Sequence, residues 1–281
     1  MDQNKLYTLI TGASDGFGKA LAIECARRKM NLVLVALPGP ALGNLAKFIE
    51  RNFNVDVKIF EKDLTYDNHC YDLLLDIVHA KLRINILINN AGIGNTQVFS
   101  ETSPEFFKQQ IKLNVLATTL LTSLFIPELR KYGPSYLLNI GSLSSFFYLP
   151  KKQVYGATKS FIFFFSKCLR RELKKDNISV SVACPGGMNT NFSVSMINRT
   201  GNYLSRMSIL NPEQVAPVVI DKMLKGKEVI IPGAVNRFSM LLDKLLPSFI
   251  KNILIGKLAN ALKPVSFANP NIHRDSSPQA A

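Results

Sequence analysis

The sequence predicts an α/β protein with a doubly wound, mostly parallel sheet of seven strands, helices on both faces and a helical C-terminal extension. Short runs of Val, Ile and Leu alternate with longer amphipathic segments, as expected when right-handed crossovers join parallel strands. Apolar residues make up 47% of the 281 residues, enough for one large core. Neither an internal repeat nor a linker divides the chain into smaller units.

The expected strands are short, nearly continuous apolar runs, which are typical of parallel strands buried on both faces. Their ranges are Leu6–Ile10, Leu32–Ala36, Val55–Phe60, Ile84–Ile88, Tyr136–Ile140, Val180–Ala183 and Val229–Ile231. Between them, amphipathic stretches such as Gly18–Lys29, Pro104–Tyr132 and Val154–Lys175 predict helices. Such a sheet binds ligands beyond the carboxyl ends of its strands.

A glycine-rich turn links the first expected strand to the first expected helix. Gly12, Gly16 and Gly18 are spaced Gly-x-x-x-Gly-x-Gly, which differs from the G-x-G-x-x-G pattern. A plain turn would explain the glycines alone. Their place between a strand and a helix favours a dinucleotide site, where backbone N–H groups approach a pyrophosphate at the positive end of the helix.

Polar and small residues also close the third and fourth expected strands, at Asp63–Leu64 and Asn89–Gly92. Residues of these types can line a dinucleotide, although ordinary turn chemistry also uses them. Each of these strand ends is therefore ambiguous when it is taken alone.

Tyr155 and Lys159 stand four residues apart in an expected helix, so they project from one face as neighbours. A phenol with a pKa of about 10 is a poor acid–base at neutral pH, and an adjacent ammonium favours its ionised form. Ser142, at the end of the fifth strand, could reach the same point and hydrogen-bond a substrate oxygen. Asn114, within an earlier helix, could hold a water that passes protons. A packed Tyr beside a solvated Lys would explain Tyr-x-x-x-Lys alone.

In this order the motifs resemble the short-chain dehydrogenase/reductase family, over roughly residues 5 to 232. The signature in this chain comprises Thr11-Gly12-Ala13-Ser14-x-Gly16-x-Gly18, Asn89-Asn90-Ala91-Gly92, Asn114, Ser142, Tyr155-Gly156-Ala157-Thr158-Lys159 and Pro185-Gly186. The resemblance implies a Rossmann-like fold and an NAD(P)(H)-dependent oxidoreductase that moves a hydride between nicotinamide and a carbonyl or alcohol carbon.

The resemblance also implies a role for each site residue. Tyr155 would be the acid–base, Ser142 would orient the substrate carbonyl, and Asn114 would support a proton relay. Lys159 would lower the Tyr155 pKa and hold the nicotinamide ribose, Asp63 would contact adenine, and Thr190 would contact the carboxamide. The implied cofactor contacts are Gly12, Ser14, Gly16, Phe17, Gly18, Asp63, Leu64, Asn90, Ala91, Gly92, Tyr155, Lys159, Pro185, Gly186 and Thr190.

The end of the second strand departs from the family pattern. The family places an acid there for NAD or a base for the NADP phosphate, and this chain has Ala36, Leu37 and Pro38. Without the acid, no carboxylate accepts hydrogen bonds from the adenosine ribose of NAD, and none repels the 2′-phosphate of NADP. Without the base, the 2′-phosphate lacks its usual cationic partner. We expect NADP(H) rather than NAD(H). Gly141, where many relatives have a second serine, is expected to be harmless.

Two further segments suggest partners. The helix carrying Phe161–Phe165 is apolar on several faces, and because relatives pack it across a subunit interface, we expect a homodimer or homotetramer. The loop Gly186–Asn211 is long for a compact domain, and we predict that it is a substrate lid. Its apolar residues suggest a small-molecule substrate that is hydrophobic, such as a fatty-acyl, sterol or sphingoid-type ketone; they are Met188, Phe192, Met196 and Ile197.

We expect residues 1–232 to form the dinucleotide-binding catalytic domain, 233–267 a helical extension packed on it, and 268–281 a disordered tail. Apolar residues at helical spacing run from Leu241 to Leu262, and Pro247 divides them into two short helices. One alternative is that these helices pack on the domain and cover the substrate site. The other is that residues 241–263 form a basic amphipathic surface that binds anionic lipid.

Composition bears on which partners, metals and cellular location we expect for the protein. The net charge of +14 comes from Lys and Arg spread along the chain, with neither a basic cluster nor an aromatic platform, so we expect no nucleic-acid partner. Four cysteines without CxxC spacing suggest packed, reduced thiols, and the histidines lack metal-ligand spacing, so no metal is expected. Without a signal-peptide pattern or a spanning apolar stretch, we expect a cytoplasmic protein, with membrane association left open. A dinucleotide-sensing binding protein is the alternative, disfavoured because a sensor needs no acid–base set.

Overall fold

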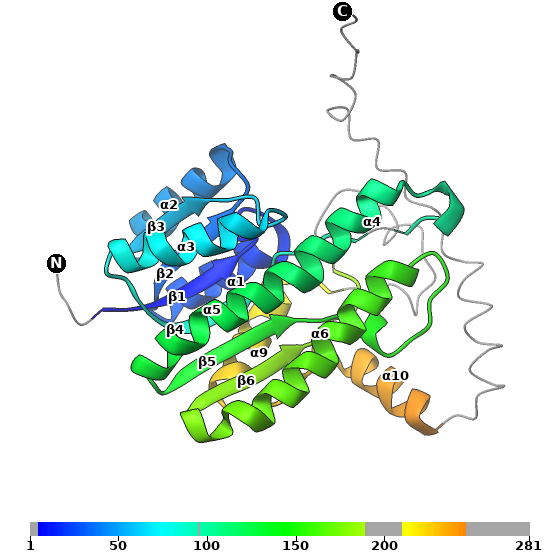
Figure 1. The fold of residues 1–281 in the computed structure, drawn as a ribbon. Helices are drawn as coiled ribbons and strands as arrows, with labels where there is room; N and C mark the ends of the chain where they lie inside the picture. Colours follow the sequence, from blue (N-terminus) through cyan, green and yellow to red (C-terminus); the bar gives the residue numbers. More distant parts are fainter. Residues whose placement is uncertain (1–4, 95, 189–209, 246–281) are drawn as a thin grey trace, which may run out of the picture.

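The computed structural model describes residues 5–94, 96–188 and 210–245 (Figure 1). Seven strands form one parallel sheet in the order β3-β2-β1-β4-β5-β6-β7. Their bounds are β1 Leu6–Thr11, β2 Asn31–Ala36, β3 Val57–Glu61, β4 Arg83–Asn89, β5 Ser135–Ile140, β6 Ile178–Ala183 and β7 Val229–Ile230. The predicted fold class and all seven strands are confirmed. The largest shifts start β3 at Val57 rather than Val55 and β6 at Ile178 rather than Val180.

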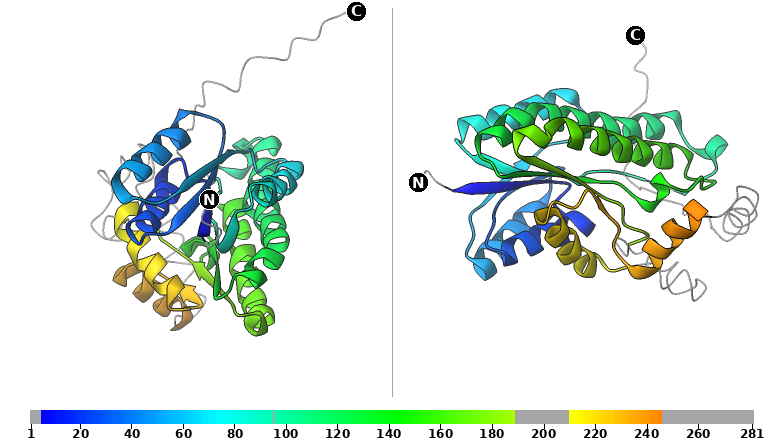
Figure 2. Two further views of the ribbon diagram at one scale, coloured as in Figure 1. Left: turned by 90° about the vertical axis from the view of Figure 1, so that its left-hand side faces the viewer. Right: turned by 90° about the horizontal axis from the view of Figure 1, so that it is seen from below.

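Helices cover both faces of the sheet, as the second panel of Figure 2 shows. One layer contains α1 (Gly16–Arg27), α2 (Pro40–Phe53) and α9 (Pro212–Leu224). The opposite layer contains α3 (Asp67–His79), α5 (Thr118–Lys131) and α6 (Gln153–Glu172). The helices α4 (Pro104–Ile111) and α10 (Ala234–Leu245) lie toward the carboxyl edge of the sheet (Figure 1).

The core is divided by the sheet into two apolar layers. Successive residues of a strand point to opposite faces, so Leu9 packs with α3 and α5 while Ile10 packs with α1 and α9. Leu137 and Leu138 on β5 divide in the same way. Because both layers exclude water from the strands, every position along the central strands favours an apolar side chain. This is why the runs are continuous rather than alternating.

The sheet changes winding direction between β1 and β4, and this places the glycine turn opposite the end of β4. The chain leaves β1 toward α1 on one face and leaves β4 toward α5 on the other. Asn90 joins the two strand ends, because its Nδ2 donates to the backbone oxygens of Thr11 at 2.9 Å and Gly12 at 3.1 Å. The crevice at this switch point is where an open α/β sheet binds ligands.

Several predicted elements differ in detail. The helix predicted over Pro104–Tyr132 consists of α4, a π-helical segment at Lys112–Ala117, and α5. A 3-10 turn at Leu173–Asp176 ends the helix predicted over Val154–Lys175. Helix α10 begins at Ala234, ahead of the apolar run predicted from Leu241. Most of the predicted lid, including Thr190, and the predicted helices beyond residue 245 lie outside the described residues.

The expectation of packed cysteines holds for three of the four. Cys25, Cys70 and Cys184 are buried, whereas Cys168 is exposed because it occupies the solvent side of α6 next to the buried Leu169. Within the part of the chain that the structure describes, no group of three His, Cys, Asp or Glu side chains is arranged to hold a metal ion.

Candidate active site

The phenol and the ammonium that the sequence pairs lie together on α6. Lys159 Nζ is 5.9 Å from the centroid of the Tyr155 ring and donates to the backbone oxygen of Ile140 at 2.8 Å. Ile140 is the last residue of β5, so this hydrogen bond ties α6 to the carboxyl end of the sheet. Ser142 follows β5 directly, and its side chain hydrogen-bonds the Tyr155 hydroxyl. Three of the predicted catalytic side chains therefore meet at one point.

Burial dominates the electrostatics of this cluster. Removal from water raises the pKa of Tyr155, the hydrogen bond from Ser142 opposes that rise, and the neighbouring Cys184 adds to it. Burial lowers the pKa of Lys159 to about 8. That Lys159 lowers the Tyr155 pKa stays a prediction. The ammonium is bound to a backbone carbonyl and stands beside the ring, while desolvation acts on the hydroxyl itself.

Asn114 holds the turn that follows β4 through side-chain hydrogen bonds. It lies in the π-helical segment, and its side chain makes two hydrogen bonds with one backbone unit. Its Nδ2 donates to Ile93 O and its Oδ1 accepts from Ile93 N, both at 2.9 Å. The Nδ2 also donates to Thr158 Oγ1 at 3.1 Å. Asn114 therefore joins the end of β4 to α6, and its contribution to a proton relay stays a prediction.

Glycines keep the space around the cluster open. A Cβ on Gly92 would lie 3.0 Å from Asn114 Oδ1 and 3.4 Å from Lys159 Nζ. A Cβ on Gly94 would lie only 2.6 and 2.7 Å from the Tyr155 ring carbons Cδ2 and Cε2. Gly94 is thus a site residue that the sequence did not single out. Its one signal is its position two residues beyond the Asn89–Gly92 motif.

A second ammonium also approaches the phenol. Lys152 Nζ lies 5.4 Å from the Tyr155 ring centroid, and burial lowers the pKa of Lys152. The Tyr155 ring is therefore within cation–π range of two lysines. Sequence reasoning missed Lys152, because it precedes the Tyr-x-x-x-Lys motif and its approach depends on how the chain enters α6.

Cys184 accounts for the glycine that precedes Ser142. A Cβ on Gly141 would lie 3.0 Å from Cys184 Sγ and 3.2 Å from Ala183 O. The thiol thus occupies the space that a second serine would need. Burial raises the pKa of Cys184 to about 12, so the thiol is neutral at physiological pH, and it hydrogen-bonds the backbone of Ser142. The contact between Gly141 and the Cys184 thiol is consistent with the prediction that glycine at position 141 does not impair the site.

The turn after β1 fits a dinucleotide. Gly12 has a φ of +64°, and a Cβ on Gly18 would lie 2.0 Å from Gly12 O, so only glycine allows the turn to close against α1. Asp15, the N-cap residue of α1, makes no side-chain capping hydrogen bond. The backbone N–H groups at the start of α1 are therefore not satisfied by a cap, as an anion site at a helix N-terminus requires.

The other predicted cofactor residues lie in several parts of the fold. Ala91 N and Asn90 N both donate to Thr11 Oγ1 at 3.0 Å, so this motif also fixes the turn. Phe17 and Leu64 are buried in the core and can offer only their backbone to a ligand. Ser14 and Gly16 lie within the turn, and Pro185 and Gly186 follow β6.

Asp63 already has hydrogen-bond partners. Its Oδ1 accepts from Thr65 N at 2.9 Å and from Thr65 Oγ1 at 2.7 Å. The carboxylate thereby shapes the turn between β3 and α3. Its contact with adenine stays a prediction.

An acid that the sequence did not indicate lies beside the end of β2. Glu61 on β3 pairs in register with Ala36, and its Oε1 accepts from Gly39 N at 2.9 Å. Leu37 is exposed there. The acid that the family pattern places at the end of β2 is absent, as the sequence shows, and the neighbouring strand supplies a carboxylate that already accepts from the loop after β2.

The fold and the site define the class: a doubly wound α/β protein with a dinucleotide turn at its switch point and a Tyr–Lys–Ser cluster beside it. The chain belongs to the short chain dehydrogenase family, whose sequence profile matches residues 7–200.

Individual relatives carry oxidoreductase names. A very-long-chain 3-oxoacyl-CoA reductase of Mus musculus is 33% identical over 189 residues, covering 64% of this chain and 58% of the relative. The human 17-beta-hydroxysteroid dehydrogenase type 3 is 32% identical over 186 residues, covering 66% of this chain and 59% of the relative. The match thus spans less than two thirds of the length of either protein.

Among solved structures, a short-chain dehydrogenase from Sphingobium yanoikuyae in complex with NADPH superposes with a TM-score of 0.73 at 27% identity, covering 95% of this chain and 99% of that one. A bulky-bulky ketone specific alcohol dehydrogenase from Comamonas testosteroni superposes with a TM-score of 0.72 at 26% identity, covering 95% and 98%. Both agree with the fold derived from the sequence. None of the helices within the described ranges combines the length and apolar character that crossing a membrane requires.

Proposed function

We propose that the chain is an oxidoreductase that reduces a ketone to an alcohol, and runs the reverse reaction, with a nicotinamide dinucleotide. The observation that carries this proposal is the meeting of Tyr155, Ser142 and Lys159 at the carboxyl edge of the sheet. A phenol, a hydroxyl and an ammonium in one site are the groups that proton transfer to a carbonyl oxygen needs.

Each side chain has one task in the proposed mechanism. A nicotinamide dinucleotide held by the Gly12–Gly18 turn and by Lys159 would supply the hydride chemistry at the substrate carbon. Tyr155 gives its hydroxyl proton to the substrate oxygen during reduction and takes it back during oxidation. Ser142 donates a hydrogen bond to that oxygen and so fixes the carbonyl. Lys159 places a positive charge where the phenol loses its proton, and its hydrogen bond to Ile140 holds the ammonium in place.

We infer that the cofactor is NADP(H) rather than NAD(H). An acid at the end of β2 would accept from the adenosine ribose and repel a 2′-phosphate, and this chain has Ala36 and the exposed Leu37 there. Glu61 is nearby but already accepts from Gly39 N. A relative of known structure binds NADPH. The test compares kcat/KM for NADPH and NADH, and a higher value for NADH would contradict the inference.

We infer that the substrate is lipophilic, with a fatty-acyl or steroid ketone as the class to test. The two named relatives act on substrates of these kinds by their names. Of the apolar residues predicted in the lid, Met188 is within the described chain and packs against the core. A panel of long-chain 3-oxoacyl thioesters, steroid ketones and short polar ketones tests this inference. Turnover confined to the short polar ketones would contradict it.

The enzymatic proposal is tested by Tyr155→Phe. Loss of the hydroxyl removes the proton donor while the ring stays in place. Turnover should therefore fall by about 10²- to 10⁴-fold while NADPH affinity stays unchanged. Tyr71→Phe, on the exposed side of α3, is the matched control. Unchanged turnover in Tyr155→Phe would refute the mechanism. NADPH binding without turnover on any ketone would instead favour a sensor.

We propose that a second copy of the chain packs against α6. Phe161 and Phe164 are 43% and 72% exposed. Beside them an apolar groove of about 460 Å³ runs between α6 and the end of α4. Its lining includes Ile111, Val115, Val154, Ala157 and Phe161. An equivalent helix from a second copy would cover this surface.

We further propose that residues 1–232 act as one catalytic domain and that the extension packs on it. Asn236 on α10 supports this arrangement, because a Cβ on Gly186 would lie 2.8 Å from its Nδ2. Contact of residues 241–263 with anionic lipid is tested by deleting residues 241–281. Unchanged vesicle binding after this deletion would contradict lipid contact.

A further inference from the structure

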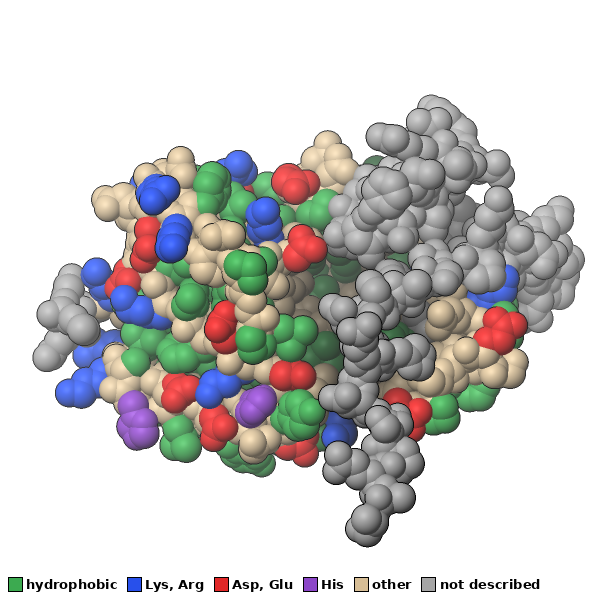
Figure 3. Space-filling model, turned by 90° about the horizontal axis from the view of Figure 1, so that it is seen from above, with side chains coloured by type: hydrophobic (Ala, Val, Ile, Leu, Met, Phe, Trp, Pro, Cys, Tyr) green, Lys and Arg blue, Asp and Glu red, His purple; other side chains and the backbone are tan. Residues whose placement is uncertain are grey.

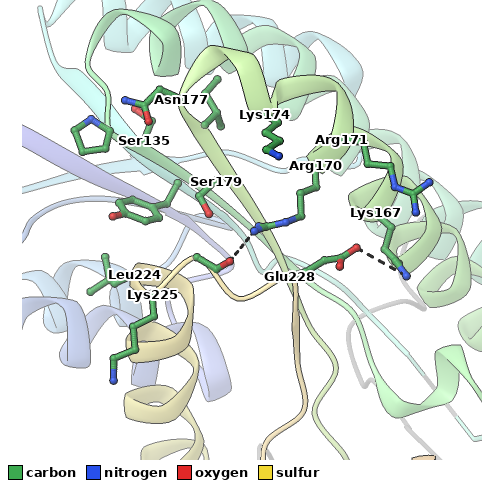
Figure 4. Close-up of a pocket in the computed structure, with 14 residues that line it drawn as sticks. Ser135, Lys167, Arg170, Arg171, Lys174, Asn177, Ser179, Leu224, Lys225 and Glu228 are labelled. Carbon is green, nitrogen blue, oxygen red and sulfur yellow. Dashed lines mark hydrogen bonds and ion pairs between the residues drawn. The ribbon is translucent and has the colours of Figure 1, made fainter.

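A basic cavity lies at the amino edge of the sheet, away from the candidate active site. It has a volume of about 620 Å³, within the range of small-molecule sites. Figure 4 shows that its lining comes from α6 and the turn after it, the starts of β5 and β6, and the end of α9. Since β5 and β6 each have six residues, about 17 Å of strand separates this edge from Ser142 and Tyr155.

The cavity holds a surplus of positive charge. Its charged lining residues are Lys167, Arg170, Arg171, Lys174, Lys225 and Glu228. Glu228 pairs with Lys167 at 3.8 Å, and Lys225 pairs with Asp221, just outside the lining, at 2.9 Å. The carboxyl-terminal ends of α6 and α9 add about half a negative charge each. When the five Lys and Arg side chains of the lining are set against Glu228, Asp221 and the two helix ends, a surplus of about two positive charges remains.

Helix capping alone does not explain the surplus. Arg170 serves the fold, because its Nη1 donates to Val180 O at 2.5 Å and its Nη2 to Gly226 O at 2.7 Å. Arg171 and Lys174 are exposed, and no carboxylate among the described residues pairs with them. Like charges gathered around one cavity repel one another, and an anion bound in the cavity would relieve this repulsion.

One lining residue also has an unpaired hydroxyl. Ser179 lies at the start of β6, and its Oγ is buried without a hydrogen-bond partner among the described residues. Figure 3 shows further Lys and Arg side chains gathered toward the same end of the molecule, at the left of that view. Such a field raises the local concentration of anions before they bind.

We propose that this cavity binds a phosphate monoester group. Such a group carries about 1.5 to 2 negative charges at pH 7, which matches the surplus, and Arg171 and Lys174 can both donate to its oxygens. A carboxylate would neutralise half of the surplus. The phosphate can belong to a soluble phosphorylated compound or to the headgroup of a lipid such as phosphatidic acid, and the experiment below separates these sources.

The test compares Arg171→Ala/Lys174→Ala with Lys47→Ala/Arg51→Ala. The control pair also removes one Lys and one Arg, both exposed and one turn apart on α2, so the net charge changes equally. Binding of inorganic phosphate is measured by calorimetry in about 0.15 M NaCl, where diffuse attraction is screened. Saturating NADH, which carries no phosphate monoester, is present so that the proposed cofactor turn does not contribute. Binding of phosphatidylcholine vesicles, with and without phosphatidic acid, is measured by sedimentation.

Saturable phosphate binding that weakens roughly tenfold or more in the cavity variant, and not in the control, supports a soluble ligand. Vesicle binding that needs phosphatidic acid and is lost only in the cavity variant supports a lipid headgroup. Absence of both, or equal weakening in the two variants, overturns the proposal. Each outcome is independent of ketone turnover, so it leaves the proposed enzymatic function untouched.

Discussion

Gly94→Ala tests whether the space beside Tyr155 matters for chemistry. The new Cβ would lie 2.6 Å from Cδ2 of the ring, and ordinary van der Waals contact begins at 3.4 Å, so the ring or the loop must move by 0.8 Å. A displacement of about 1 Å at a reacting group costs about 100-fold in rate. We therefore expect kcat/KM for ketone reduction to fall by about 10- to 100-fold, which corresponds to about 1.4 to 2.7 kcal/mol.

Gly43→Ala is the matched control, because nothing lies within 4 Å of its added Cβ. Gly43 lies within α2, where alanine should raise the free energy of unfolding by about 0.5 to 1 kcal/mol without changing activity. Steady-state kinetics and thermal unfolding are measured on both variants. Gly94 is exposed, so its variant should stay folded. A kcat/KM for Gly94→Ala within about twofold of the wild type would refute the steric reasoning, since tenfold is the smallest loss expected.

Three further predictions follow from charge and exposure. Burial lowers the pKa of Lys159 from 10.5 to about 8, so its charge destabilises the folded chain below pH 8 and this penalty disappears between pH 8 and 10.5. The stability advantage of Lys159→Met over the wild type should therefore shrink by up to about 3 kcal/mol across that window in denaturant titrations; a constant difference would contradict the shift. Lys152→Met should move the acid-side limb of the pH profile of alcohol oxidation to higher pH, because losing one cation beside the Tyr155 ring makes the phenol harder to deprotonate, whereas the exposed Lys47→Met should not. Phe164→Glu should halve the mass of a dimer in light scattering, while Leu75→Glu, on the exposed side of α3, should leave it unchanged; a monomeric wild type would contradict the proposed interface.

Strand positions and the catalytic cluster could be predicted because both depend on local pattern and on one topological rule. Continuous apolar runs marked the strands, and the carboxyl ends of parallel strands share one edge, so Ser142 was placed near Tyr155 without knowledge of any contact. Helical spacing alone paired Tyr155 with Lys159. These inferences need no information on how distant segments pack.

The features that were not predicted depend on packing between distant segments. Gly94 bears on Tyr155, and Glu61 reaches Gly39, across contacts that no periodicity encodes. The π-helical segment that carries Asn114 looks like ordinary helix in sequence. The exposure of Cys168 follows from the rotational position of α6 against the sheet. Burial, the largest cause of the raised Tyr155 pKa, also depends on packing that the sequence does not reveal.

The most direct test of the proposed chemistry is a crystal structure of the chain grown with NADPH. We predict the pyrophosphate at the Gly12–Gly18 turn, the nicotinamide ribose within reach of Lys159, and the ring beside the Tyr155 hydroxyl. A substrate carbonyl should fit between ring and hydroxyl at near-attack separations of about 3 to 3.5 Å. A cofactor bound elsewhere, or a nicotinamide ring turned away from Tyr155, would contradict the assignment.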